Sequence, residues 1–132
     1  MCVFCKIING EIPCFKIYEN ESVLAFLDIS QSTIGHTLVV PKKHVENVFS
    51  LSEEDSIEIM KAVTSVSKKL KKALNLESVN LLNNSGFLAG QTVMHFHMHI
   101  IPRYENDTFK IIQDTNEPDF AALKELCDNI NK

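Results

Sequence analysis

The sequence predicts an α+β domain in which an antiparallel meander sheet packs with one long helix, a short N-terminal helix and a C-terminal helix. Two observations predict this class. Segments with strand-like composition cluster in neighbouring pairs, and one long segment repeats apolar residues at helical spacing. Runs of strands around one helix favour an antiparallel sheet over a parallel array. The length is typical of a single domain over residues 1–132, with residues 105–132 as a C-terminal extension.

The predicted strands are short apolar or alternating segments bounded by turn residues or by proline. They are Phe15–Glu19, Val23–Ile29, Thr37–Pro41, Ser78–Asn83 and Val93–Ile101, the last of them ended by Pro102.

Three helices are predicted. The long helix begins after Ser52, whose hydroxyl can cap its first turn, and ends near Asn75. A short helix is predicted over Phe4–Gly10 and a closing helix over Asp119–Asn129. The long helix repeats apolar residues at steps of three and four, which gives it one buried face. This face is made of Ile59, Val63, Val66, Leu70 and Leu74.

Composition argues against several classes of partner. Lys and Arg number 13 against 17 Asp and Glu, a net charge of −4, and there is no basic run. Such a chain is a poor candidate for binding nucleic acid or an anionic membrane. No stretch approaches the ~20 apolar residues of a membrane span. The N-terminus lacks the pattern of a secretory signal, so a cytoplasmic protein is expected.

Three of the five histidines alternate with apolar residues within Met94–Ile101. On a strand, His95, His97 and His99 would project from one face, and the apolar residues between them would enter the core. Histidines clustered in this way are typical of metal sites or acid–base sites.

Two chemistries can use this row of imidazoles. It can hold one catalytic metal ion, or one imidazole can act as a nucleophile while its neighbours bind the anion that it attacks. The preceding loop, Ser85–Thr92, combines two glycines, an amide and a hydroxyl, which are groups that suit a phosphate. The loop therefore favours the nucleophile.

The segment His95–Ile101 resembles the His-φ-His-φ-His-φ-φ signature, where φ is apolar, of the histidine triad (HIT) superfamily of nucleotide hydrolases and transferases. Cys2–Pro13, Phe26–Ile29 and Gly35–His44 are similar to further motifs of its Hint branch. The resemblance spans roughly residues 2–104. It implies the HIT-like α+β fold and a homodimer.

The resemblance also implies residue roles. His97 would be the nucleophile that attacks the α-phosphorus of a purine nucleotide, giving a covalent nucleotidyl-histidine that water then hydrolyses. His99 and His36 would act with it, either orienting His97 or contacting the phosphate. Asn84 matches the loop asparagine of the family, with Asn83 as the competing match. The implied substrate-binding residues are Val3, Phe4, Ile7, Phe26 and Ile29 for the base, Asp28 for the ribose, and Gln91, Thr92 and His99 for the phosphate.

Cys2 and Cys5 have the spacing of zinc ligands, and a tetrahedral site needs two further groups. His44 and His95 are available, and some Hint-type proteins that the chain resembles hold a structural zinc with the matching residues. One structural zinc ion per chain, and no organic cofactor, is therefore expected. Two free thiols beside hydrogen-bonded histidines, or a thioredoxin-like redox pair, are the alternatives.

The function expected from these residues is hydrolysis or transfer at the α-phosphorus of a purine nucleoside 5′-phosphoramidate or a related conjugate, with release of the nucleoside monophosphate. A dinucleoside polyphosphate hydrolase of the Fhit type is one alternative. A nucleotide-binding regulatory protein without turnover is the other.

Overall fold

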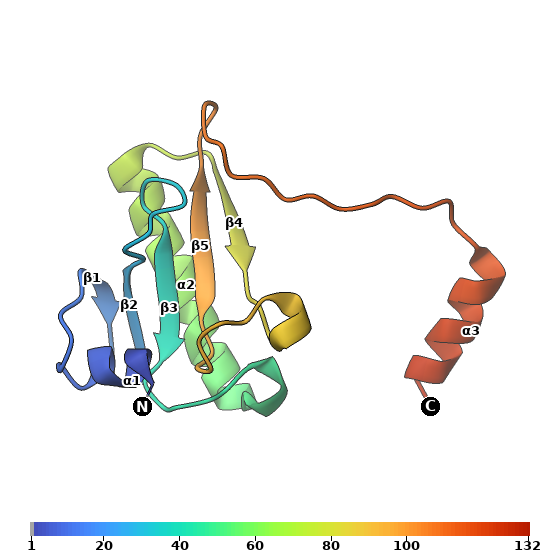
Figure 1. The fold of residues 1–132 in the computed structure, drawn as a ribbon, viewed down its shortest axis with the longest axis horizontal. Coiled ribbons are helices and arrows are strands. Elements are labelled where there is room, and N and C mark those ends of the chain that lie inside the picture. The colour runs from blue at the N-terminus through green and yellow to red at the C-terminus, as the bar shows by residue number, and fades with distance from the viewer. Residues whose placement is uncertain (1) are drawn as a thin grey trace.

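The computed structural model describes residues 2–132 as a compact body that carries a long C-terminal arm (Figure 1). The helices and strands lie in the order α1 (Val3–Ile8), β1 (Lys16–Glu19), β2 (Val23–Leu27), β3 (Thr37–Pro41), α2 (Glu53–Leu74), β4 (Ser78–Leu82), β5 (Met98–Arg103) and α3 (Phe120–Ile130). Two short 3-10 turns, η1 (Val48–Ser50) and η2 (Phe87–Ala89), lie in the loops.

The five strands form one sheet in the order β1-β2-β3-β5-β4, and every neighbouring pair is antiparallel. The strands β1 and β4 are therefore the two edges. In Figure 1, α2 lies behind the sheet and α1 lies at the end of the sheet where β3 finishes. The predicted α+β class with an antiparallel sheet is confirmed.

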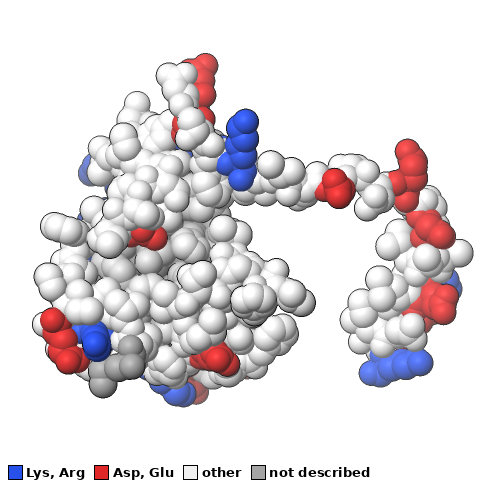
Figure 2. All heavy atoms as spheres, in the orientation of Figure 1, with Lys and Arg blue, Asp and Glu red and all other residues white. Residues whose placement is uncertain are grey.

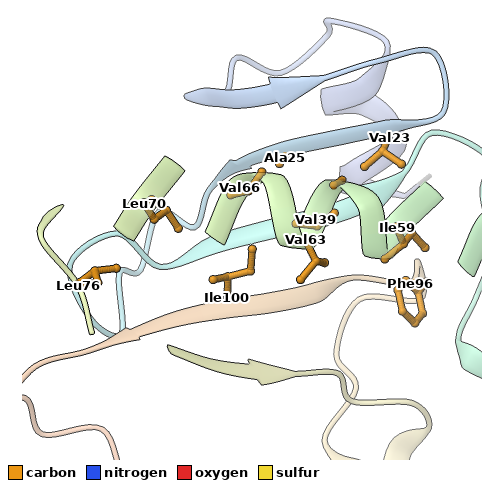
Figure 3. Close-up of a cluster of buried hydrophobic side chains, with 11 residues drawn as sticks. Val23, Ala25, Val39, Ile59, Val63, Val66, Leu70, Leu76, Phe96 and Ile100 are labelled. Carbon is orange, nitrogen blue, oxygen red and sulfur yellow. The ribbon is translucent and has the colours of Figure 1, made fainter. Parts of the chain in front are cut away.

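The two faces of the sheet bury two separate apolar clusters. The larger cluster joins α2 to alternate residues of the central strands, and Phe96 and Ile100 belong to it (Figure 3). The smaller cluster lies on the other face, where Phe4 of α1 packs with Leu24, Phe26 and Leu38. Alternation along β2 and β3 thus supplies both clusters, because successive side chains point to opposite faces.

The long helix agrees closely with its sequence pattern. Ser52 caps α2 by accepting a hydrogen bond from the Asp55 amide at 3.1 Å. Asn75 ends the helix in the left-handed conformation. The residues of the predicted face are buried, apart from Leu74, which is partly buried against the same cluster.

The predicted strand over Val93–Ile101 is wrong at both ends, because β5 begins at Met98 and continues through Pro102 to Arg103. Before Met98 the backbone has other partners: the Phe96 amide donates to the Val45 carbonyl, and the His97 carbonyl accepts from the Asn83 side chain. At the other end, β3 pairs with β5 only as far as Ile100. Beyond Ile100, the side of β5 that faces β3 is unpaired. Pro102, which has no backbone N–H, therefore removes no ladder bond on that side.

Two smaller corrections concern other elements. The strand predicted over Val23–Ile29 ends at Leu27, so Asp28 and Ile29 lie in the loop that follows it. The predicted C-terminal helix exists as α3, but it does not close over the body: every residue from 110 to 132 is exposed. Within residues 2–132, no helix is both long and apolar enough to cross a membrane.

Gly35 occupies a left-handed conformation (φ +92°) where a β-carbon would lie 2.6 Å from Leu74 Cδ1 and 3.2 Å from Pro102 Cγ. Gly35→Ala should therefore lower the free energy of unfolding by roughly 1–2 kcal/mol for the backbone conformation and by about 1–3 kcal/mol more for overpacking. Gly10 (φ +79°) has nothing within 4 Å of the same position, so Gly10→Ala is a matched control with the backbone cost alone. Urea unfolding measures the free energy of unfolding of both variants. Equal losses of stability in Gly35→Ala and Gly10→Ala would contradict the overpacking argument.

Candidate active site

A cavity of about 420 Å³ opens on the face of the sheet opposite α2. Its walls come from α1, the segment that follows α1, the end of β2 and the loop between β4 and β5. Among the described residues, Asp28 is the one that lines the cavity with a full formal charge at neutral pH. The face of the body seen in Figure 2 likewise carries few charged side chains.

The ring of His97 is held in one orientation at the back of this cavity. Its Nδ1 lies 2.8 Å from the carbonyl oxygen of His95, and Phe4 packs edge-on against the ring with centroids 5.1 Å apart. A carbonyl oxygen only accepts, so Nδ1 carries the proton and donates it. In the neutral ring, the lone pair is therefore on Nε2, where it can act as a base or a nucleophile.

A chain of hydrogen bonds fixes the tautomers of His36 and His99. The Ser32 amide donates to His36 Nδ1 at 3.2 Å, so a neutral His36 carries its proton on Nε2. That Nε2 donates to His99 Nδ1 at 2.9 Å, so His99 in turn carries its proton on Nε2. His99 lines the cavity with its ring centroid 5.0 Å from that of His97, whereas His36 lies behind it. The cavity thus combines one imidazole lone pair with one N–H donor.

His36 and His99 are both held neutral at pH 7. Burial, together with the nearby His97 and His36, lowers the pKa of His99 to about 4. Burial also lowers the pKa of His36, although the carboxylate of Asp28 opposes this effect. The hydrogen-bond directions derived for neutral rings therefore apply at physiological pH.

Asp28 lines the cavity as a carboxylate. Burial would raise its pKa, but hydrogen bonds from the Ser30 amide and hydroxyl to Oδ1 outweigh burial, and the pKa is lowered. The other oxygen, Oδ2, lies 3.7 Å from His36 Nε2. A carboxylate can accept about four hydrogen bonds, so Asp28 has capacity left for hydroxyl donors in the cavity.

The loop before the histidines contains one clear departure from the expected ligand set. Gln91 is buried and does not line the cavity, because its amide is fully engaged: Oε1 accepts from the Gly86 amide, and Nε2 donates to the carbonyls of Glu46 and Val93. The Gln91 side chain therefore shapes the loop from within and does not line the cavity. Its neighbour Thr92 does line the cavity.

The geometry also separates the two competing asparagines. Asn84 lines the cavity, whereas the side chain of Asn83 donates to the His97 carbonyl at 3.0 Å and accepts from the Ser85 hydroxyl at 2.7 Å. Asn83 thus supports the backbone that carries His97.

Nine of the ten residues expected to bind substrate line the cavity, Gln91 being the exception. Sequence reasoning assigned no part to Ile12, Pro13, Cys14 and Phe15, which form a further wall. Ile12 and Pro13 lie within the Hint-like opening segment, which was the available signal for them. Nothing in the sequence pointed to Cys14 or to the Ser32 amide, which is a main-chain group.

The four residues expected to bind metal meet beside the cavity, with their ligand atoms all within 4.8 Å of one another. Nδ1 of His95 lies 3.5 Å from both sulfur atoms and 3.2 Å from Nδ1 of His44. The opposite nitrogen of His95 donates to the Pro41 carbonyl at 2.7 Å, so Nδ1 presents a lone pair to the cluster. Burial and the neighbouring Cys2 raise the pKa of Cys5. The arrangement can hold a metal ion.

The model of the HIT domain matches residues 9–106. The chain belongs to the HIT family. A HIT-family chain from Bacillus subtilis, the protein hit, is 49% identical over 99% of this chain and 92% of its own length.

Two relatives of this HIT protein carry names that state an activity. An adenosine 5′-monophosphoramidase of Schizosaccharomyces pombe is 46% identical over 77% of this chain and 74% of its own length. An adenylylsulfatase of Arabidopsis thaliana is 42% identical over 80% of this chain and 54% of its own length.

Solved structures agree with the fold. A Streptococcus mutans protein superposes with a TM-score of 0.95 at 45% identity, covering 98% of this chain and 83% of that one. A HIT-family protein from Bacillus subtilis superposes with a TM-score of 0.94 at 45% identity, covering 98% and 94%.

The lowered pKa of His99 predicts a pH dependence of stability. Above pH 6.5, His99 is neutral in both the folded and the unfolded chain, whereas between 6.5 and about 4 only the unfolded chain binds a proton there. The free energy of unfolding should therefore fall as the pH drops through this interval. In the His99→Gln variant, the free energy of unfolding should fall less steeply with decreasing pH. Urea unfolding at a series of pH values measures this. A His99 imidazole whose NMR shifts titrate near pH 6.5 in the folded protein would contradict the argument.

Proposed function

We propose that this HIT protein hydrolyses a purine nucleoside 5′-phosphoramidate, or a related nucleotide conjugate, at its α-phosphorus. The observation that carries the proposal is the His97 ring, whose Nδ1 is committed to the His95 carbonyl so that Nε2 offers a lone pair to the cavity. The two named relatives support the class of reaction, since both names state the breakdown of an adenosine monophosphate conjugate.

In the proposed first step, His97 Nε2 attacks the α-phosphorus and forms a phosphorus–nitrogen bond. The bond to the leaving group breaks, and the amine leaves with its electron pair and takes a proton from solvent. In the second step, the oxygen of water attacks phosphorus, the bond to Nε2 breaks and its electron pair returns to the imidazole. The proton of the water goes to solvent and the monophosphate is released. Dividing one displacement into two is the gain of covalent catalysis.

Neutral N–H donors would stabilise the charge that develops on the phosphate. His99 offers its Nε2–H beside His97, and the bond from His36 holds it in that tautomer. Thr92 also lines the cavity and can donate its hydroxyl. Donors already oriented toward the reacting group need no reorganisation during the reaction.

The rest of the cavity would bind the nucleoside. Asp28 can accept hydrogen bonds from both ribose hydroxyls, since it is ionised and has unused acceptor capacity. The base would lie between α1 and the end of β2, where Phe4, Ile7 and Phe26 supply apolar surface. Val3 and Ile29 stand at the exposed rim of this region.

We also propose a structural zinc ion on Cys2, Cys5, His44 and His95. The donor set fits: two thiols and two imidazole nitrogens are drawn together, and the outer nitrogen of His95 is already oriented by the Pro41 carbonyl. Zinc bound there would hold α1 against the segment that carries the histidines. Thiols that serve as ligands require a reducing compartment, which supports a cytoplasmic location.

A two-fold homodimer completes the proposal. The edge strand β4 is unpaired on its outer side within the described chain, and Leu81 on it is exposed. An unpaired, partly apolar edge is a natural site of association with another chain.

Substitution of the nucleophile tests the proposed reaction. His97→Ala should abolish turnover of adenosine 5′-phosphoramidate while nucleotide affinity changes less than about threefold, because the apolar walls and Asp28 supply the binding. Asp28→Ala is the matched variant and should instead weaken nucleotide binding by about tenfold or more. Quenching the wild-type reaction with labelled substrate should trap an acid-labile, base-stable adduct on His97.

An active His97→Ala variant, or an adduct on His95 or His99, would overturn the assignment. Rapid turnover of dinucleoside polyphosphates without turnover of phosphoramidates would favour the Fhit-type alternative. Tight nucleotide binding with no turnover of either substrate would favour a regulatory binding protein.

Metal analysis tests the zinc site. Protein purified under reducing conditions, without a tag and without added metal, should contain about one equivalent of zinc, and Cys2 and Cys5 should resist alkylation until a chelator is added. Cys14 and Cys127 serve as internal controls, since their thiols should be alkylated irrespective of the chelator. Metal-free protein with all four thiols equally reactive would rule the site out.

A further inference from the structure

The last part of the chain forms an arm that stands away from the body. This C-terminal arm, residues 110–132, consists of an extended stretch followed by α3, and all of it is exposed. Figure 2 shows open space between the arm and the body. The arm crosses beyond β4, the edge strand of the sheet (Figure 1).

The direction of the arm is set at its root. Arg103, the last residue of β5, donates to both carboxylate oxygens of Asp107 at 3.0 Å and to the carbonyl of Phe109 at 2.8 Å. It also donates to the Asn80 side chain on β4 at 2.7 Å. Four hydrogen bonds to one planar guanidinium hold the chain in a defined turn at the point where it leaves the sheet.

The helix at the end of the arm has an apolar stripe with no partner in the described chain. Phe120, Leu123, Leu126 and Ile130 recur at steps of three and four, and each is more than half exposed. A helix of 11 residues is marginal in water on its own, so α3 needs a partner surface in order to persist.

The arm takes the same position in related crystal structures. The Streptococcus mutans and Bacillus subtilis proteins superpose on 98% of this chain with TM-scores of 0.95 and 0.94. The arm makes up about a sixth of the 132 residues, so scores this high require the arm and the body to superpose together. A detached arm that keeps one position in different proteins must be held by something outside its own body.

The side of the body that faces the arm is itself apolar. The turns η1 and η2 lie on that side (Figure 1), and Phe49, Phe87 and Leu88 on them are almost fully exposed. A hydrogen bond from the Val48 amide to the Ser85 hydroxyl joins the two loops that carry these side chains. We call the three exposed side chains the patch. With the β4 edge and the stripe of α3, this patch frames the open space.

We propose that a second copy of this chain occupies that space, so that α3 of each protomer packs by its apolar stripe on the body of the other. The inference rests on the homodimer of the proposed function and adds the exchanged arm to it. A two-fold axis makes the exchange reciprocal, because a surface that receives an arm belongs to a protomer that also extends one. The arrangement covers the β4 edge, the patch and the stripe together.

Contacts between copies can be observed directly in the full-length protein. In a mixed sample of ¹³C-methyl-labelled and unlabelled protomers, isotope-filtered NOEs should connect the methyl groups of Leu123 and Leu126 to the other protomer. Amide exchange across α3 should be at least tenfold slower than in an unstructured peptide. NOEs confined to one protomer, or α3 amides that exchange as in an unstructured peptide, would overturn the proposal.

A pair of variants tests the stripe. Leu126→Glu should raise the dimer dissociation constant, measured by sedimentation, at least tenfold and remove the protection of α3. Ala121→Glu adds the same charge to the opposite face of α3 and should leave the dissociation constant and the protection of α3 unchanged. Equal effects of the two substitutions would contradict docking by the stripe. Turnover of adenosine 5′-phosphoramidate is recorded separately, so loss of the exchanged arm and failure of the proposed hydrolysis give different results.

Discussion

The proposed chemistry depends on one hydrogen bond, in which His97 Nδ1–H donates to the carbonyl oxygen of His95. This carbonyl is available because the backbone at His95 has left the sheet ladder, which begins only at Met98. The surroundings fix its position, since the ring of His95 is tied to Pro41 and the carbonyl of His97 is held by Asn83. The fold thus selects the tautomer of the nucleophile through main-chain geometry, without a carboxylate partner.

The same short segment serves three parts of the molecule at once. Phe96 and Ile100 enter the core beneath α2, whereas His97 and His99 line the cavity and His95 joins the two cysteines and His44. This division follows from alternation, and the sequence therefore predicted it even though the strand begins later than expected. The alternation of faces is kept although His95 lies in a bend before the strand and the ladder begins only at Met98.

Features that depend on local periodicity or on a motif could be predicted from sequence, and features that depend on backbone contacts could not. The α2 face follows its spacing, and the cluster of Cys2, Cys5, His44 and His95 was expected from the cysteine pair together with the resemblance to Hint-type proteins. The engagement of the Gln91 side chain could not be predicted, because nothing in its identity reveals that three backbone groups satisfy its amide. The Ser32 amide behind His36 could not be seen at all, since every residue has such a group. The position of α3 was equally hidden, because amphipathic spacing shows that a helix needs a partner but not which surface provides it.

The scarcity of charge in the cavity bears on how binding and rate would be divided. The phosphate would meet neutral N–H and O–H donors, and Asp28 is the one charged lining residue in the part of the chain that the structure describes. A cationic side chain there would bind substrate and product phosphates alike, and uniform binding does not accelerate a reaction. Neutral donors gain most when charge grows on the phosphate oxygens, which occurs in the transition state. Affinity would then come chiefly from the nucleoside, through Asp28 and the apolar wall of α1 and β2. That binding energy positions the α-phosphorus against His97 Nε2, which is how walls remote from the reacting bond would enter the rate.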